Sequence, residues 1–135
     1  MLSDVRIIQL PRIEDERGNL SFLENFSQVP FCIKRVYWIY DVPGGEIRGG
    51  HAFKSLNEII ISLSGSFDVV LSDGKEEIRY SMNRSYYGLF VPNMIWRRME
   101  NFSTNALAMV VVDQEFNEND YIRDENEFKL MLNEK

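Results

Sequence analysis

The feature that most constrains the fold is the stretch Gly45–Gly65, which contains the only histidine of the chain, His51. Glycines crowd the residues before this histidine and indicate a turn, whereas the β-branched residues after it indicate strands. Residues two apart in a strand point to the same face, so His51 and Phe53 share one face. Two imidazoles at this spacing, completed by a carboxylate such as Glu58 from the next strand, could hold a metal ion. Phe53 removes one of these ligands.

Short β-type segments separated by turns recur along the chain and predict an antiparallel sandwich or barrel. We expect strands at residues 5–10, 19–24, 31–40, 51–54, 58–63, 67–71, 75–82, 86–91, 95–99 and 105–113. Ser72–Gly74 contains an Asp-Gly pair, which favours a hairpin. Apolar residues at helical spacing within 124–133, behind an acidic first turn, predict a C-terminal helix of two to three turns.

The segment 31–40 predicts a strand with a mixed face. Arg35 and Tyr37 alternate there with Ile33 and Ile39 on one side of the strand. Such a face is either the solvated side of an edge strand or the wall of a pocket, and the pattern does not choose between them.

Length and composition fit one domain spanning residues 1–135. Hydrophobic residues make up 44% of the chain and charged residues 27%, which is ordinary for a soluble globular protein. The net charge of −6 opposes a nucleic-acid surface, because such a surface needs a basic field. The single cysteine, Cys32, cannot form an internal disulfide, no signal run follows Met1, and no apolar stretch reaches the roughly 18–20 residues of a membrane span. We therefore expect a cytoplasmic protein without a nucleic-acid or membrane partner.

Two motifs resemble those of the cupin superfamily. The spacing within Gly45–Gly65 resembles the first cupin motif, in which metal-binding members have a second histidine at the position of Phe53. Gly88–Asn101 resembles the second motif, with Arg97 at the ligand position and Met94 at a glycine position. A guanidinium stays protonated and repels a cation. The resemblance implies an all-β, antiparallel jelly-roll barrel that holds neither a metal nor another cofactor.

A closer resemblance, covering almost the whole chain, is to the sugar 3,4-ketoisomerases of the WxcM-like family. Its segments are residues 15–20, 30–37, 48–54, 88–92 with Trp96, and 120–123. This family acts on thymidine-diphosphate-linked 4-keto-6-deoxyglucose in bacterial surface-glycan pathways. The resemblance implies an isomerase whose ligand is a nucleotide-linked sugar, and a homodimer formed by exchange of N-terminal strands.

The same resemblance implies that His51 is an acid/base residue, while Phe53 replaces a second active-site histidine. One neutral imidazole could take the proton from C3, which the 4-keto group acidifies, and return it to C4 on the same ring face. Tyr37 is our candidate for moving protons between the two oxygens. The alternative is a structural histidine capped by Glu58.

Basic side chains near the motif strands are candidates for binding the diphosphate and stabilising an enediolate, although each alone could be a solvated surface charge. They are Arg17, Arg35, Arg48 and Lys54. Phe53 and Arg97 complete the predicted substrate-binding set. Two other functions stay open: a non-catalytic sugar-nucleotide-binding protein, acting as a regulator or partner subunit, and a metal-dependent cupin enzyme, which the ligand count disfavours.

Overall fold

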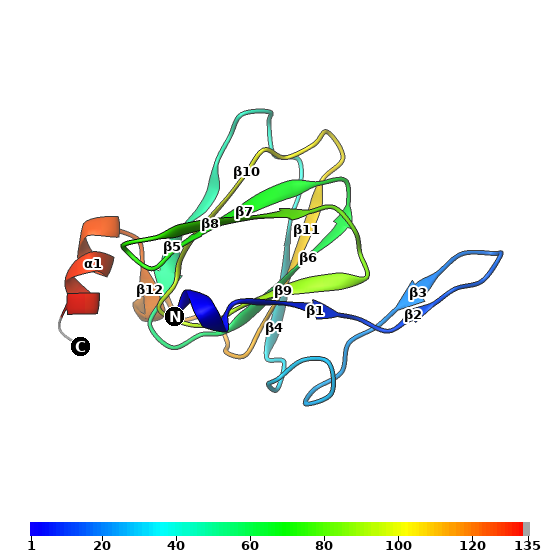
Figure 1. Ribbon diagram of the computed structural model, residues 1–135, viewed down its shortest axis with the longest axis horizontal. Coiled ribbons are helices and arrows are strands. Elements are labelled where there is room, and N and C mark those ends of the chain that lie inside the picture. The colour runs from blue at the N-terminus through cyan, green and yellow to red at the C-terminus, as the bar shows by residue number, and fades with distance from the viewer. Residues whose placement is uncertain (134–135) are drawn as a thin grey trace.

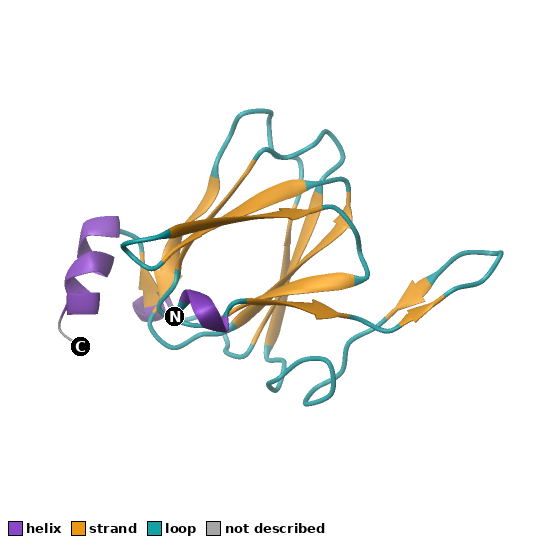
Figure 2. Cartoon of the chain, in the orientation of Figure 1, coloured by secondary structure: helices purple, strands orange, loops and turns teal. Residues whose placement is uncertain are grey.

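The computed structural model describes residues 1–133, which form antiparallel strands and one α-helix (Figures 1 and 2). The strands are β1 (Arg6–Gln9), β2 (Arg12–Ile13), β3 (Leu20–Ser21), β4 (Arg35–Ile39), β5 (Arg48–Phe53), β6 (Glu58–Ser64), β7 (Phe67–Ser72), β8 (Glu77–Met82), β9 (Tyr87–Val91), β10 (Trp96–Glu100), β11 (Leu107–Val112) and β12 (Tyr121–Ile122). Two 3-10 turns, η1 (Leu2–Asp4) and η2 (Glu118–Asp120), and the helix α1 (Glu125–Asn133) complete the order.

Ten strands form two five-stranded sheets whose inner faces pack against each other. The strand orders are β1-β9-β6-β11-β4 and β12-β5-β10-β7-β8, and neighbouring strands are antiparallel. Inward side chains of both sheets form the main apolar core, as period-2 alternation requires. The predicted jelly-roll barrel with a C-terminal helix is therefore confirmed.

Strand β6 is buried on both faces, which explains its continuous run of apolar residues. Ile60 points into the main core, whereas Ile59 and Ile61 belong to a second cluster on the outer face of the sheet. Val29 and Phe31, from the segment before β4, cover that outer face. The chain thus uses an irregular segment as a third layer over one sheet.

Helix α1 covers the outer face of the other sheet, at the end opposite the β2–β3 hairpin (Figure 1). Phe128 is fully buried in a cluster with side chains of β5, β10 and β12. The Asp124 carboxylate accepts a hydrogen bond from the Asn126 amide at 2.8 Å and so caps the first turn. The predicted helix is confirmed, and within residues 1–133 no helix is long and apolar enough to cross a bilayer.

Most strand boundaries differ from the expectations by one or two residues, and three strands differ more. The strand expected at 19–24 is only the two-residue β3, paired with β2 in a hairpin that projects from the barrel (Figure 1). Ile13 and Leu20 there are each 55% exposed, and neither belongs to an apolar cluster of the described residues. Strand β4 is shorter than 31–40, and β5 starts three residues before His51 because the glycines 49 and 50 continue the strand.

The Asp-Gly pair does lie in the β7–β8 hairpin, but in a four-residue loop rather than a two-residue turn. Ser72 pairs with Glu77 across it. The Asp73 carboxylate accepts hydrogen bonds from the amides of Lys75 and Glu76 at 2.9 and 2.8 Å, and these bonds stabilise the longer loop.

Candidate active site

Strand register brings four of the site's side chains onto the inner face of one sheet. Arg97 of β10 pairs with His51 of β5, and Tyr121 of β12 pairs with Phe53 of β5. Paired residues on neighbouring strands point to the same face, as do residues two apart along a strand. The single histidine is therefore flanked by a guanidinium on one side and by two aromatic rings on the other.

The facing sheet supplies a carboxylate, a phenol and a second guanidinium. Arg35 of β4 and Glu58 of β6 both pair with Val112 of β11, and Tyr37 lies two residues along β4. The alternate residue Trp38 is 59% exposed, so β4 turns Arg35 and Tyr37 inward. This face of the segment 31–40 is a pocket wall.

Between the sheets lies a cavity of about 540 Å³. Its lining contains five of the eight predicted site residues, namely Arg35, Tyr37, Arg48, His51 and Arg97. Phe116, Tyr121 and Arg123 also line it. The cavity is therefore strongly basic, which suits an anionic ligand.

Arg97 and Glu58 form an ion pair at the base of this cavity. Both residues are 1% exposed, and Arg97 Nε lies 2.9 Å from Glu58 Oε1. Arg97 Nη2 also donates to the Tyr37 hydroxyl oxygen at 2.8 Å, and Nη1 donates to the Gly49 carbonyl at 3.5 Å. Burial opposes the charge on Arg97, but Glu58 and Tyr37 outweigh it and raise the pKa of Arg97. The guanidinium is a fixed cation.

Burial raises the pKa of the Tyr37 phenol to about 12, despite the attraction of Arg97 for a phenolate. Burial likewise raises the pKa of Glu58, and the Arg97 charge opposes that rise. The phenol is therefore protonated at neutral pH, and its oxygen already accepts a hydrogen bond from Arg97. Its own proton can be donated elsewhere.

His51 is 8% exposed, and its Nε2 has no hydrogen-bond partner within residues 1–133. Burial lowers its pKa to about 2, with smaller contributions from Arg97 and Arg123, so the imidazole is neutral. The expected alternative of a histidine capped by Glu58 is wrong, because the Glu58 carboxylate pairs with Arg97. A buried, neutral, unpartnered imidazole nitrogen beside a cavity is placed to accept a proton.

Phe53 lies behind His51 and is not part of the cavity lining. It is 3% exposed, and its ring meets the His51 ring edge-on with centroids 4.7 Å apart. The Phe53 ring also contacts the Tyr121 ring at 4.6 Å. Within this chain Phe53 contacts the imidazole, and its predicted contact with substrate stays a prediction.

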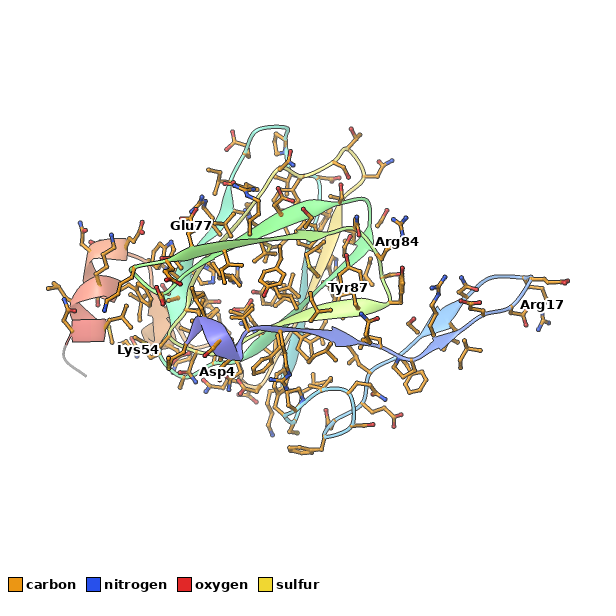
Figure 3. The ribbon with its side chains drawn as sticks, viewed as in Figure 1. Asp4, Arg17, Lys54, Glu77, Arg84 and Tyr87 are labelled. Carbon is orange, nitrogen blue, oxygen red and sulfur yellow. The ribbon has the colours of Figure 1, made fainter. Side chains whose placement is uncertain are left out.

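Two predicted ligand-binding residues lie away from the cavity of their own chain. Arg17 sits at the tip of the β2–β3 hairpin, with its side chain 90% exposed and ion-paired to Asp15 (Figure 3). Lys54 is exposed just past the end of β5, beyond Phe53. Their predicted roles therefore depend on contacts that a single chain does not make.

Residues 116–123 contribute to the site, whereas the sequence marked 120–123 only as a segment of the family resemblance and gave no residue there a role. Strand β12 has only two residues, which is too short for periodicity to reveal. A buried carboxylate, Asp120, anchors it by accepting from the amides of Ser55 and Leu56 at 3.0 and 3.1 Å. These bonds fix Tyr121 beside His51.

Within the part of the chain that the structure describes, no group of three or more His, Cys, Asp or Glu side chains is arranged to hold a metal ion.

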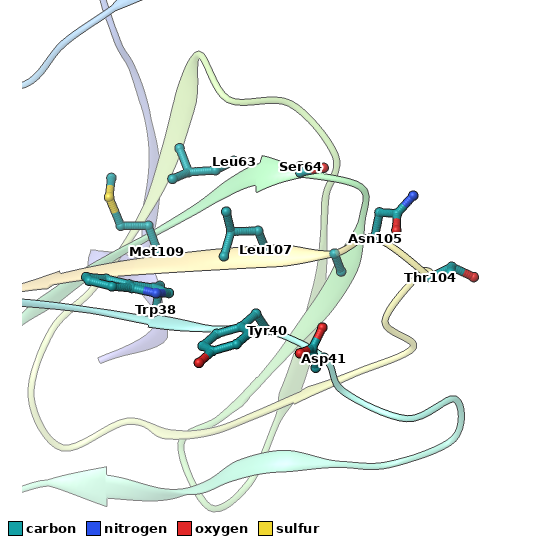
Figure 4. Close-up of a pocket in the computed structure, with 10 residues that line it drawn as sticks. Trp38, Tyr40, Asp41, Leu63, Ser64, Thr104, Asn105, Leu107 and Met109 are labelled. Carbon is teal, nitrogen blue, oxygen red and sulfur yellow. The ribbon is translucent and has the colours of Figure 1, made fainter.

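A second hollow, of about 580 Å³, lies on the outer face of the β4-β11-β6 sheet, lined by Trp38, Tyr40, Leu63 and Met109 among others (Figure 4). Its lining has no titratable group except Tyr40 and Asp41, and it shares only Trp38 with the lining of the basic cavity.

Comparison with known proteins agrees with this geometry. The family model described as FdtA, WxcM-like, C-terminal matches residues 3–133. A TDP-4-oxo-6-deoxy-alpha-D-glucose-3,4-oxoisomerase of Aneurinibacillus thermoaerophilus is 38% identical over 127 residues, 94% of this chain and 91% of that protein.

Solved structures give the same result. A 3,4-ketoisomerase from Helicobacter canadensis is 42% identical, with a TM-score of 0.94 over 96% of this chain and 98% of that one. A mutant 3,4-ketoisomerase from Thermoanaerobacterium thermosaccharolyticum, in complex with TDP-4-keto-6-deoxyglucose, is 31% identical, with a TM-score of 0.97 over 100% and 98% of the two chains. The chain belongs to the WxcM-like family of sugar 3,4-ketoisomerases.

Proposed function

We propose that this protein is an isomerase that moves the keto group between C4 and C3 of TDP-linked 4-keto-6-deoxyglucose. The observation that carries the proposal is the neutral, unpartnered Nε2 of His51 beside a basic cavity, in a chain 38% identical to a 3,4-oxoisomerase. The cavity offers a base for a carbon-bound proton and several cations for a diphosphate.

His51 starts the reaction by taking the proton from C3. The electron pair of that C–H bond forms the C3=C4 double bond, and the carbonyl electrons move to the C4 oxygen. The imidazolium then returns the proton to C4 on the same ring face, while the C3 hydroxyl proton passes to the C4 oxygen and the electrons of that O–H bond form the C3 carbonyl. A positioned base of this kind contributes roughly 100- to 10,000-fold to rate.

Tyr37 and Arg97 support the negative charge that develops on the C4 oxygen. The Tyr37 oxygen accepts from Arg97 Nη2, which leaves its O–H free to donate to the substrate. The fixed cation stabilises the phenolate that would follow proton donation. In this arrangement Arg97 acts through Tyr37.

The diphosphate is proposed to bind Arg35 and Arg48. Both line the cavity, and the buried Nε and Nη2 atoms of Arg35 have no hydrogen-bond partner among the described residues. Buried guanidinium N–H groups without partners are costly, and phosphate oxygens would satisfy them in pairs. We propose thymidine as the nucleoside, because related 3,4-ketoisomerase structures contain TDP-4-keto-6-deoxyglucose or TDP.

We also propose a homodimer. Val36 and Trp38 of the edge strand β4, and Tyr40 just after it, expose apolar surface, and within residues 1–133 Ile13 and Leu20 of the β2–β3 hairpin belong to no apolar cluster. Pairing two copies would cover both features. A hairpin reaching a second copy would carry Arg17 away from its own barrel and toward the partner. A cytoplasmic location and a surface glycan as the sugar's destination stay predictions.

We expect the reaction to need no transition metal, because Phe53 and Arg97 occupy two of the four cupin ligand positions. Elemental analysis of the purified protein should find no stoichiometric zinc, iron or manganese. About one metal per chain, lost together with activity on chelation, would contradict this expectation.

Turnover of TDP-4-keto-6-deoxyglucose, followed by NMR, tests the function directly. The wild type should form the 3-keto sugar, and His51→Asn should not, while TDP affinity stays within about twofold because the diphosphate contacts are elsewhere. A second candidate is a non-catalytic sugar-nucleotide binder, which the loss of the second histidine at Phe53 favours. TDP binding without any product from the wild type would support that candidate instead.

A further inference from the structure

We propose that Phe53 is a positioning residue, whose ring holds the His51 imidazole in one orientation and leaves its Nε2 without a protein partner. This inference rests on the proposed function, in which His51 is the base for the proton on C3. The family resemblance places a second histidine at this position, and the contacts of the phenylalanine indicate what it does in this chain instead.

Phe53 contacts the imidazole directly. The two ring centroids are 4.7 Å apart and the ring planes are at 77°, which is an edge-to-face geometry that aromatic pairs favour. The ring of Tyr121 lies 5.1 Å from the His51 ring and 4.6 Å from the Phe53 ring. Rotation of the imidazole about its Cβ–Cγ bond would disturb its contacts with both rings at once, so the two rings together fix its plane.

The Phe53 ring can act as a support because it is itself closely packed. It is 3% exposed and belongs to the main apolar core. The Phe53 carbonyl accepts a hydrogen bond from the Met94 amide at 2.8 Å, and Phe53 pairs with Tyr121 of β12 in the sheet. A functional group supported by a packed strand is held more precisely than one on a loop.

The chemistry of the ring matters as well as its place. A phenyl ring has no hydrogen-bonding group of the kind that would occupy the Nε2 atom of His51, and this atom has no partner within residues 1–133. An imidazole at the same place could bond to His51, and the two groups would then titrate as a coupled pair. In this chain the apolar neighbour leaves the nitrogen available.

Arg97 gives a second reason for an apolar ring at residue 53. It is a fixed cation bound to Glu58, and its guanidinium carbon lies 6.0 Å from the Phe53 ring centroid. A protonated imidazole in place of Phe53 would meet that cation with like charge, whereas the face of a phenyl ring attracts a cation weakly at this distance. Arg97 and Phe53 are therefore compatible neighbours around a single histidine.

Phe53→Leu tests this role, because it keeps apolar volume and removes the flat ring. Phe53 is not in the cavity lining, so the change should act through His51 and not through contact with the substrate. We expect kcat to fall about tenfold or more, while KM and the affinity for TDP stay within about twofold. Exchange of the C3 proton in D₂O should fall by the same factor, because His51 also carries that step. Phe53→Met, whose flexible side chain fills the same space, should show the same losses.

Imidazole nitrogen NMR reads the orientation of the base directly, because His51 is the only histidine of the chain. Burial keeps the wild-type imidazole neutral, so its two ring-nitrogen signals should stay at the separate positions of one tautomer between about pH 5 and 8. In Phe53→Leu the two signals should move toward each other as the ring exchanges between tautomers and orientations. A residue that served only the stability of the fold would leave these signals unchanged.

Phe67→Leu is the matched control. Phe67 is a phenylalanine of the same core, 1% exposed and stacked on Phe102, and it lies outside the cavity lining. The same substitution there should also lower the free energy of unfolding, yet leave kcat within about twofold and the imidazole signals in place. The comparison separates a loss of core packing from a loss of positioning.

Phe53→His distinguishes positioning from a missing catalytic group. The variant keeps a flat ring but adds a possible hydrogen-bond partner for the His51 nitrogen, so its rate should stay at or below that of the wild type. A rise of about tenfold or more would overturn the proposal, because the chain would then have lacked a second catalytic imidazole.

The remaining outcomes separate this inference from the proposed function. A wild-type rate in Phe53→Leu, a loss of rate without any change in the imidazole signals, or a loss of TDP affinity of about tenfold would each overturn the role of Phe53 and leave the function standing. No product and no exchange from the wild type would overturn the proposed function. The imidazole signals would still decide whether Phe53 orients His51, because they do not depend on turnover.

Discussion

At the scale of single residues, the site depends on a guanidinium in the interior of the barrel. Arg97 replaces a metal ligand of the cupin motif, yet Glu58, the carboxylate ligand position of that motif, still faces it and supplies the counter-charge at 2.9 Å. Removing one partner of such a buried pair leaves an uncompensated charge in the core. We therefore expect Arg97 and Glu58 to be retained together or replaced together. Glu58, whose carboxylate could bind a metal ion in the cupin motif, here holds the Arg97 guanidinium in place.

Gly49 controls where that cation lies. Its φ is +70°, and a Cβ there would collide with Arg97 Nη1. Gly49→Ala should therefore displace the guanidinium from Tyr37, reduce turnover by about tenfold or more, and lower the free energy of unfolding by roughly 1–3 kcal/mol. Kinetics and urea denaturation measure both effects. Gly44→Ala is the control, because a Cβ at Gly44 would meet no atom within 4 Å; equal losses in the two variants would contradict the argument.

His51 predicts how stability depends on pH. Burial lowers its pKa from 6.5 to about 2, so between these values the unfolded chain binds a proton there that the folded chain does not. The contribution of His51 to stability is present above about pH 6.5 and is lost as pH falls toward 2, at up to about 1.4 kcal/mol per pH unit. Urea denaturation at several pH values should show a shallower acid loss in His51→Asn than in the wild type. Parallel pH curves for the two proteins would mean that the imidazole is protonated in the native state.

Sequence spacing predicts the arrangement of these residues well where a strand fixes the direction in which a side chain points. It predicts the arrangement poorly where a side chain contacts residues that are distant in the sequence. The same-face relation of His51 and Phe53 follows from period 2 alone. The pairing of Glu58 with Arg97 instead of His51 depends on which strands become neighbours across the barrel, and local pattern does not encode that. Tyr121 lies in the family segment 120–123 but was given no role, because a two-residue strand shows no periodicity.

At the scale of elements, helix α1 closes the back of the sheet that presents His51. Phe128 is fully buried against Trp96, whose indole centroid is 5.8 Å from the phenyl ring, and against Ala52 in the strand that carries His51. The helix was predictable because its apolar spacing extends over several turns, whereas β12 was not because two residues show no period.

Phe128→Ala should destabilise the fold by about 3–5 kcal/mol through lost burial and the cavity left behind. Leu130→Ala, two residues on and 64% exposed, is the matched control on the same helix and should change stability by less than about 0.5 kcal/mol. Urea denaturation of both variants gives the comparison. A small effect of Phe128→Ala would mean that α1 is docked by other contacts and is not needed to support β5.

At the scale of the whole molecule, the β2–β3 hairpin and the exposed face of β4 are the features that one chain leaves unexplained. The hairpin extends from the barrel with Arg17 at its tip, far from the cavity of its own chain (Figure 3). The proposed homodimer gives both features a role. Light scattering at micromolar concentration should then give about twice the chain mass of 15.9 kDa, and a monomer mass would count against the dimer.

If Arg17 serves the partner's cavity, two inactive variants should complement each other. Arg17→Ala damages the site to which its hairpin reaches, whereas His51→Asn damages the site of its own barrel. A hybrid dimer of the two then has one doubly damaged site and one intact site. Random pairing makes half of the dimers hybrids, so a co-refolded equal mixture should recover about a quarter of wild-type activity.

Pairing His51→Asn with Tyr37→Phe is the control, because both residues line the cavity of the same chain. Each site of that hybrid carries one lesion, so no activity should return. Recovery in the Arg17 mixture alone would place Arg17 in the partner's site. An Arg17→Ala protein that keeps wild-type activity on its own would mean that Arg17 has no role in the site. If Arg17→Ala is inactive and neither mixture gains activity, Arg17 acts within its own chain, contrary to its exposed place at the hairpin tip.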